Sequence, residues 1–227
     1  MLIRIPAALT KQELVQCRSA FALSDWVDGK HTAGVQSTEA KHNLQVPEGS
    51  PQARQLGEMI LRALGRSPLF NAAALPLRVF PPLFNRYDEG MRFDPHVDNA
   101  IRFVPSANIR VRTDISATLF ISEPRDYDGG ELVIEDTYGS QSVKLPAGDL
   151  LLYPATSLHR VTPIKRGVRW ASFFWVQSMV KDDGKRRDLF ELDRAITEVR
   201  SALGDAHHAP IALTAVYHNL LRRWSEI

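Results

Sequence analysis

The segment from Leu77 to Gln177 constrains the fold most, because it breaks into short runs of β-branched and aromatic residues. Turn-forming sequences separate these runs, among them Asp128-Gly129-Gly130, which favours a hairpin turn, and Pro146-Ala147-Gly148-Asp149. Many short strands with such turns are typical of a sandwiched or closed all-β domain. The sequence therefore predicts a β core of the jelly-roll kind. The expected strands lie within Leu77–Tyr87, Ile115–Ser122, Glu131–Glu135, Ser142–Leu145, Asp149–Tyr153 and Val168–Gln177.

Helices are expected before the β core. Thr10-Lys11-Gln12-Glu13 fits the capping-box pattern and predicts a helix over about residues 11–23. Ser50-Pro51 predicts a second helix, because serine caps a helix and proline suits its first position. The polar stretch Asp28–Glu48 lies between the two helices, and we interpret it as a solvated loop.

Two apolar stripes at helical spacing occupy the end of the chain. We interpret them as amphipathic helices joined by the loop Asp205–Pro210, which either cover the β core or form an oligomer contact, as in a homodimer. The chain then divides into a β domain with N-terminal helices, residues 1–180, and a C-terminal helical extension, residues 181–227. One stripe consists of Leu189, Leu192, Ile196, Val199 and Leu203, and the other of Leu213, Val216, Tyr217, Leu220, Leu221 and Trp224.

The composition excludes several classes of protein. With 28 basic and 26 acidic side chains the net charge is only +2, which gives no general electrostatic footprint for nucleic acid. The N-terminus has no signal-peptide pattern, and no apolar stretch approaches the ~20 residues of a membrane span. Cys17 is the single cysteine and fits the apolar side of the first helix, so we expect a buried thiol and a cytoplasmic protein.

The motif His96-Val97-Asp98 carries most of the chemical information. Residues i and i+2 of an extended chain point to the same side, so His96 and Asp98 present an imidazole and a carboxylate together. His159 follows the expected strand Asp149–Tyr153 and a short turn, and it supplies a third ligand. Two histidines and one carboxylate form the facial triad of non-haem iron oxygenases, whereas structural zinc sites favour thiolates.

Arg169 stands within the apolar run Val168–Gln177, where a buried charge needs a partner. Its planar guanidinium matches a carboxylate in bidentate geometry. One interpretation is a bound carboxylate ligand. The alternative is a structural salt bridge across the sheet.

The order His-x-Asp, a distant histidine and an arginine ten positions later resembles the iron- and 2-oxoglutarate-dependent dioxygenase superfamily. The string Asn85-Arg86-Tyr87 before His96, together with Tyr127-Asp128-Gly129-Gly130-Glu131-Leu132, is similar to bacterial PKHD-type hydroxylases. These are relatives of prolyl 4-hydroxylases and include a group linked to iron uptake. The length of the chain and its helical end also resemble that group, so the resemblance covers essentially the whole sequence.

The resemblance implies a mainly β protein with a double-stranded β-helix (jelly-roll) core and flanking helices. It implies Fe(II) on His96, Asp98 and His159, and 2-oxoglutarate anchored by Arg169. Tyr87 would help to hold this cosubstrate, with a core tyrosine as the alternative. The reaction would consume O2, with ascorbate as an auxiliary reductant. It would hydroxylate a C–H bond of a peptidyl or small-molecule substrate, yield succinate and CO2, and have a link to iron homeostasis.

Two other functions are alternatives to this one. A non-catalytic sensor would bind iron and 2-oxoglutarate through the same residues without forming succinate. A nucleic-acid demethylase of the same superfamily is disfavoured by the near-neutral charge. The segment Asn99–Asp114, which carries Arg102, Arg110 and Arg112, follows the motif directly. It is either a solvated loop or a lid that attracts an anionic substrate.

Overall fold

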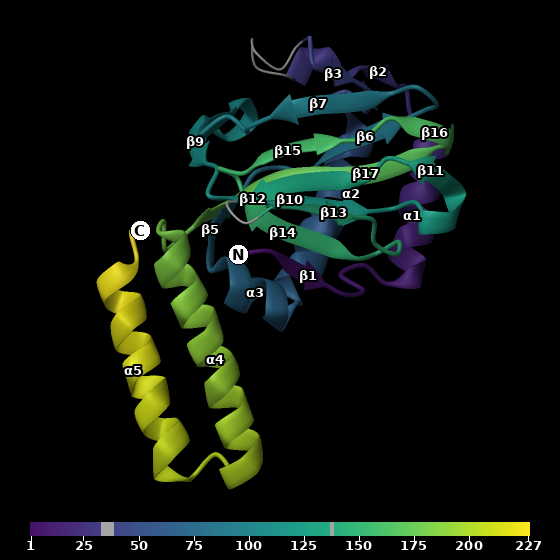
Figure 1. Ribbon diagram of the computed structural model, residues 1–227. Helices are drawn as coiled ribbons and strands as arrows, with labels where there is room; N and C mark the ends of the chain where they lie inside the picture. The colour runs from purple at the N-terminus through teal and green to yellow at the C-terminus, as the bar shows by residue number, and fades with distance from the viewer. Residues whose placement is uncertain (33–38, 137–138) are drawn as a thin grey trace.

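Two antiparallel sheets form the centre of the protein in the computed structural model, which describes residues 1–32, 39–136 and 139–227, and the side chains of all of these except 31 and 32 (Figure 1). Within the described residues the larger sheet has eight strands and the smaller has five. The prediction of a mainly β jelly-roll core with flanking helices is confirmed.

The larger sheet runs in the order β1-β14-β10-β17-β6-β4-β2, with β5 also paired to β17. Its strands are β1 (Ile3–Ile5), β14 (Leu150–Pro154), β10 (Ile115–Phe120), β17 (Arg169–Ser178), β6 (Leu83–Tyr87), β4 (Leu44–Gln45), β2 (Val27–Asp28) and β5 (Pro76–Val79).

The smaller sheet runs in the order β13-β12-β15-β7-β3. Its strands are β13 (Gly139–Val143), β12 (Leu132–Asp136), β15 (Leu158–Val161), β7 (Arg92–His96) and β3 (Lys41–His42). Two strand pairs lie beside the sheets, namely β11 (Tyr127–Gly129) with β16 (Ile164–Gly167), and β8 (Ile101–Val104) with β9 (Ile109–Arg112).

Alternation along the strands of the larger sheet separates two cores. In β14, Leu150 and Leu152 pack with the helices, whereas Leu151 and Tyr153 point to the other side and pack with residues of the smaller sheet. Successive side chains of a strand point to opposite faces, so a run of apolar residues indicates a strand that is covered on both faces.

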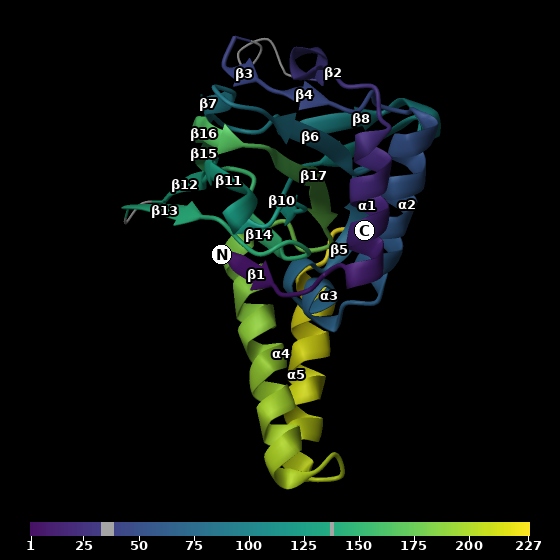
Figure 2. The ribbon, with the colours of Figure 1, turned by 90° about the vertical axis from the view of Figure 1, so that its right-hand side faces the viewer.

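Helices α1 (Lys11–Ala22), α2 (Pro51–Gly65) and α3 (Pro68–Ala74) supply the cover on the outer face of the larger sheet (Figure 2). The expected caps are present, since Thr10 and Glu13 form a complete capping box and the Ser50 side chain accepts from the backbone of Ala53. Cys17 is fully buried on α1, as predicted. Burial raises the pKa of its thiol to about 12.

Three local predictions are wrong. The stretch Asp28–Glu48 contributes short strands to both sheets, because β4 pairs with β6 and β3 pairs with β7. The segment Asn99–Asp114 is a β-hairpin of β8 and β9 rather than an irregular loop. Asp128-Gly129-Gly130 ends β11 at a bulge opposite β16 instead of forming a hairpin turn.

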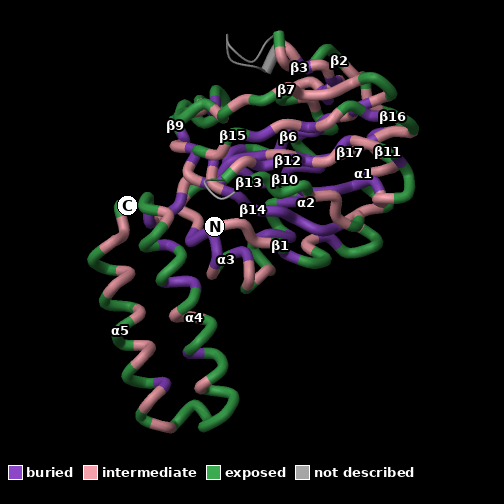
Figure 3. The backbone as a smooth tube through the Cα atoms, viewed as in Figure 1, coloured by how far each residue is buried: buried purple, intermediate pink, exposed green. Residues whose placement is uncertain are grey.

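The C-terminal helices α4 (Asp183–Leu203) and α5 (His208–Trp224) pack against each other and extend away from the β core (Figures 1 and 2). The alternative in which they cover the core is therefore wrong. The helix α5 also begins at His208, inside the expected loop Asp205–Pro210. At the base of this helical hairpin Leu189 packs with Leu75 and Val180. Farther out Ile196 and Pro210 are buried, while most of the outer part is exposed (Figure 3).

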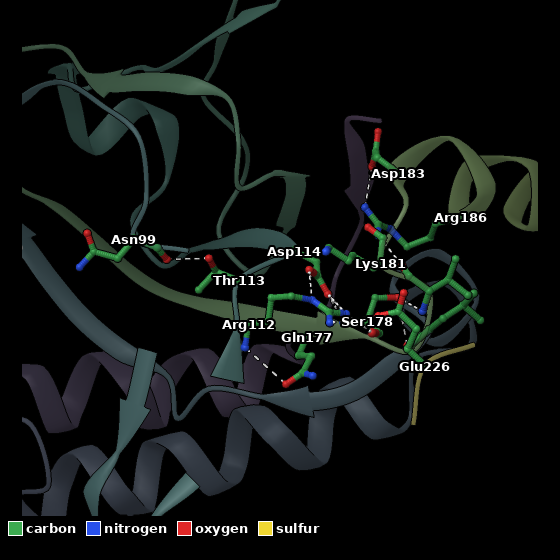
Figure 4. A network of polar contacts seen from close by, with 12 residues as sticks. Asn99, Arg112, Thr113, Asp114, Gln177, Ser178, Lys181, Asp183, Arg186 and Glu226 are labelled. Atoms are coloured by element: carbon green, nitrogen blue, oxygen red, sulfur yellow. Dashed lines mark hydrogen bonds and ion pairs between the residues drawn. The ribbon is translucent and has the colours of Figure 1, made fainter. Parts of the chain in front are cut away.

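A polar network holds this base to the β core (Figure 4). Arg112 on β9 donates from Nε to Asp114 over 2.7 Å and reaches Glu226 over 3.3 Å. Asp114 in turn accepts from the backbone N–H of Ser178 at 2.9 Å. Arg186 of α4, only 1% exposed, donates to the carbonyl of Val180 at 2.8 Å.

Among the described residues, no helix combines the length and apolar character that crossing a membrane requires.

Candidate active site

The three predicted ligands come together because β7 and β15 are neighbours in the smaller sheet. His159 lies opposite His96 in the register of these strands, and Asp98 follows β7 by two residues. One ligand atom from each of the three side chains lies within 4.8 Å of the others. The Nε2 atom of His159 is 3.7 Å from Oδ2 of Asp98. The sequence motif therefore folds into one cluster with the donor set of a facial triad.

Backbone carbonyls orient both imidazoles. Nδ1 of His96 is 2.9 Å from the carbonyl oxygen of Asp94, and Nδ1 of His159 is 3.0 Å from that of Ser157. A carbonyl oxygen can only accept, so each neutral ring carries its proton on Nδ1 and leaves the Nε2 lone pair available. This arrangement is common for histidines that bind metals.

Neighbouring groups keep the imidazole of His96 neutral and hold the carboxylate of Asp98 in place, as metal binding requires. Burial, followed by the nearby His159, lowers the pKa of His96 to about 4, so its imidazole is neutral at neutral pH. The ring of Phe93 stacks on His96 with 3.5 Å between centroids. Ser116 of β10 donates from Oγ to Oδ2 of Asp98 at 2.5 Å, which fixes the carboxylate. Ser116 of the larger sheet thus positions Asp98, which follows β7 of the smaller sheet.

Arg169 begins β17 and lies opposite Tyr87 of β6. It is 1% exposed, and its Cζ atom is 5.4 Å from the ring centroids of both Tyr87 and Phe120. Across residues 1–32, 39–136 and 139–227 it forms no ion pair, and its Nε has no hydrogen-bond partner. The alternative of a structural salt bridge across the sheet is therefore wrong. A buried guanidinium with this surplus of donors suits a carboxylate ligand.

Gly130 lies against this arginine. A Cβ atom at that position would be 2.4 Å from Cδ1 of Ile164 and 3.1 Å from Cδ of Arg169. Its φ of +67° also lies in the left-handed region that favours glycine. The glycine is thus required for close packing around the guanidinium.

One pocket of about 760 Å³, part of it open to solvent, joins the triad to Arg169 and Tyr87. Lys41 and Arg102 also line it. Lys41, in the stretch that was expected to be a solvated loop, is only 3% exposed, and burial with repulsion from Arg102 lowers its pKa to about 7.

Of the three arginines in Asn99–Asp114, only Arg102 lines this pocket, whereas Arg110 is exposed and Arg112 belongs to the network at the base of the helical hairpin. Sequence reasoning missed Lys41 altogether. Its polar neighbours Asn43 and Gln45 are buried as well, so the local sequence carried no signal that marks this stretch as part of a sheet.

Comparison with known sequences identifies the family. The profile of the 2OG-Fe(II) oxygenase superfamily matches residues 82–177, and that of the PKHD-type hydroxylase C-terminal domain matches residues 183–226. A PKHD-type hydroxylase of Methylobacterium nodulans is 64% identical over 227 residues, which is 100% of both chains. The chain belongs to the PKHD-type hydroxylases. The PKHD-type hydroxylase PiuC of Pseudomonas aeruginosa is 58% identical, again over 100% of both chains.

Solved structures share the fold of this PKHD-type hydroxylase at low sequence identity. A Trichoplax adhaerens prolyl hydroxylase in complex with a peptide fragment has a TM-score of 0.55 and 16% identity, over 83% of this chain and 86% of that one. A Pseudomonas putida prolyl-4-hydroxylase has a TM-score of 0.51 and 21% identity, over 78% of this chain and 92% of that one. These likenesses support the jelly-roll assignment.

Family membership confirms the expected activity class. This PKHD-type hydroxylase is an Fe(II)- and 2-oxoglutarate-dependent dioxygenase. The residues present fit both groups, since the pocket contains two imidazole donors, one carboxylate and a buried guanidinium without an ion pair among the described residues. Hard and borderline nitrogen and oxygen donors are those that Fe(II) takes in such sites.

Proposed function

We propose that His96, Asp98 and His159 bind Fe(II), and that Arg169 binds the far carboxylate of 2-oxoglutarate. The observation that carries this assignment is a complete facial-triad donor set in the same pocket as a buried arginine that has no ion pair within the described chain. The metal and cosubstrate supply the oxidation of a C–H bond, with succinate and CO2 as co-products and O2 as oxidant.

The contribution of the protein itself is orientation and the exclusion of water. Ser116 holds Asp98, and two backbone carbonyls hold the imidazoles, so the donors are preorganised before a metal binds. Tyr87, 1% exposed, lines the pocket beside Arg169, and we assign it to holding the cosubstrate. Burial raises the pKa of its phenol, which therefore stays protonated and can donate a hydrogen bond to a carboxylate.

The test is the production of succinate from 2-oxoglutarate by purified protein with Fe(II), O2 and ascorbate as the auxiliary reductant. Succinate formation that depends on Fe(II) and disappears in His96→Ala supports the proposed residues. A protein that binds both Fe(II) and 2-oxoglutarate, yet never forms succinate, would instead be the sensor considered above. Retention of Fe(II) affinity in His96→Ala would contradict the metal assignment.

The primary substrate is proposed to be a peptidyl residue or a small molecule. A C–H bond must lie beside the metal, and the pocket around the triad has aromatic walls that include Phe93, Phe173 and Trp175. The absence of a basic excess, with a net charge of +2, counts against a nucleic-acid substrate. The link to iron homeostasis stays a prediction from the family resemblance.

The helical hairpin of α4 and α5 is proposed to mediate a homodimer. Large apolar side chains lie exposed on it, with Leu203 at 52%, Ile211 at 57% and Val216 at 49% of full exposure. Burial of such side chains in a symmetric contact is a common reason for dimer formation. We also propose that the enzyme works in the cytoplasm, where a reducing environment suits both Fe(II) and the single thiol of Cys17.

A further inference from the structure

The proposed function assigns no role to two basic residues that line the active-site pocket. Lys41 reaches the pocket from β3 of the smaller sheet, and Arg102 reaches it from β8. Lys41 is 3% exposed, and Arg102 is partly buried. Their position places two basic side chains in the same pocket as the triad.

Aromatic rings place these two cations on one wall of the pocket. Nζ of Lys41 lies 5.4 Å from the ring centroid of Phe173, and Cζ of Arg102 lies 4.7 Å from that of Trp175. Phe173 and Trp175 are two residues apart on β17, so both point to the same face of the strand, about 7 Å apart along it. Lys41 and Arg102 are thus neighbours, which agrees with the electrostatic repulsion that Lys41 receives from Arg102.

The same wall lies next to the metal site. Nζ of Lys41 is also 5.5 Å from the ring centroid of Phe93, and Phe93 stacks directly on His96. A ligand group held by Lys41 would therefore lie within a few atoms of the triad. A substrate anchored so close to the triad can place one of its C–H bonds beside the metal.

The charges of the pocket favour an anion at this wall. With the proposed ligands bound, the positive charges of Fe(II) and Arg169 are offset by the carboxylate of Asp98 and the two carboxylates of 2-oxoglutarate. Arg102, together with the protonated fraction of Lys41, then leaves an excess of positive charge in the described part of the lining. Asp98, Asp28 and Glu48 all attract Lys41, and of these three only Asp98 lines the pocket. A pocket with a positive excess and apolar walls attracts an anionic ligand.

We propose that Lys41 and Arg102 bind an anionic group, a carboxylate, of the primary substrate, so that the enzyme hydroxylates an acidic substrate. This inference rests on the proposed function, because it presupposes that Arg169 and the triad hold 2-oxoglutarate and the metal. Phe173 and Trp175 flank the apolar part of such a substrate while the two cations fix its acidic end. The substrate class is thereby narrowed from any small molecule or peptide to one with a carboxylate close to the target C–H bond.

The experiment compares benzoate with benzamide, two probes of nearly the same shape that differ in charge. Each is titrated into protein loaded with Mn(II) and saturating 2-oxoglutarate, and binding is followed by the paramagnetic relaxation of the probe's ring protons. We expect benzoate to bind at least about tenfold more tightly than benzamide, since a charge-assisted contact is lost with the amide. The N-acetyl amides of aspartate and asparagine form a second pair that tests a carboxylate carried by a peptide.

Four variants locate the effect. Lys41→Gln and Arg102→Gln should each reduce the preference for benzoate several-fold, and the double variant should abolish it. Arg110→Gln removes the same charge from the same hairpin, but at an exposed position outside the pocket, and should retain the preference. Bound Mn(II) and 2-oxoglutarate in each variant show that the protein is folded.

The outcomes separate this inference from the proposed function. Equal binding of both members of each pair to the parent protein, including no detectable binding of either, overturns the inference while metal and 2-oxoglutarate binding remain intact. A preference for benzoate that survives in the double variant also overturns it. A collapse of 2-oxoglutarate affinity in Lys41→Gln would assign this cation to the cosubstrate instead. Failure of the parent protein to bind Mn(II) or 2-oxoglutarate would contradict the proposed function itself, and this inference with it.

Discussion

Replacement of Arg169 by methionine separates the two roles that a buried arginine can have. Methionine keeps much of the volume of the side chain but removes its charge and all of its donors. Because Arg169 is 1% exposed, solvent does not screen its contact with a ligand. Loss of one partner from a buried, hydrogen-bonded charge pair costs about 2–5 kcal/mol. The affinity for 2-oxoglutarate should therefore fall by about 30-fold to several thousand-fold.

The stability of the ligand-free protein should respond in the opposite way. Arg169 forms no ion pair within the described residues, and replacement of a buried charge by an apolar side chain of similar volume is often neutral or stabilising. The melting temperature without 2-oxoglutarate should therefore stay the same or rise. A structural ion pair would give the contrary result, since breaking one costs about 3–5 kcal/mol, or roughly 6 °C or more in a chain of this size.

The assay is a titration of 2-oxoglutarate into the Fe(II) protein under anaerobic conditions, followed by absorbance, together with thermal unfolding of the ligand-free form. Arg166→Met is the matched control, because Arg166 is 62% exposed and its ion pair with Asp128 lies outside the pocket. The control should bind 2-oxoglutarate normally. An Arg169→Met protein that is destabilised without ligand, yet binds 2-oxoglutarate as well as the parent, would refute the reasoning.

Three further predictions concern other parts of the molecule. Ser116→Ala should weaken Fe(II) binding about tenfold or more in an anaerobic titration, because the hydroxyl holds Asp98; unchanged affinity would show that the carboxylate needs no such support. Native Cys17 should resist iodoacetamide at pH 8 by mass spectrometry and react once unfolded. Burial raises the pKa of this thiol from 9.0 to about 12, so between pH 9 and about pH 12 only the unfolded chain loses the thiol proton. The contribution of the thiol to the free energy of unfolding therefore falls as the pH rises through this range. Cys17→Ala should lack this contribution. Ile211→Asp should convert a dimer to a monomer in analytical ultracentrifugation, and a monomeric parent protein would contradict the proposed contact.

The parts of the site that local sequence could predict are those with short spacing or strict order. His96 and Asp98 share a face because they are two residues apart, and this follows from strand geometry alone. His159 required the further assumption that its strand lies next to β7, which the pairing of His159 with His96 bears out. Arg169 was conspicuous because a charged residue in an apolar strand is costly.

Lys41 could not be predicted, because its position depends on long-range pairing. It lies on a strand of two residues that pairs with Arg92 and Phe93, far away in the sequence. A strand that short has no recognisable period, and its polar neighbours are typical of a loop. Burial of Lys41 is created by the sheet that forms around it.

The C-terminal extension illustrates another limit. Its apolar stripes correctly predicted two helices, but a stripe does not specify what will cover it. In the structure each stripe mainly meets the other helix, and only the base reaches the core around Leu75 and Val180. The partner of an amphipathic face is a property of the tertiary arrangement.

A crystal structure of the anaerobic complex with Fe(II) and 2-oxoglutarate shows directly whether the triad and Arg169 bind these two ligands. We expect metal bound by Nε2 of His96, Nε2 of His159 and a carboxylate oxygen of Asp98, with the far carboxylate of 2-oxoglutarate on the guanidinium of Arg169. A metal bound elsewhere, or a 2-oxoglutarate that turns its far carboxylate to Lys41 instead, would contradict this expectation.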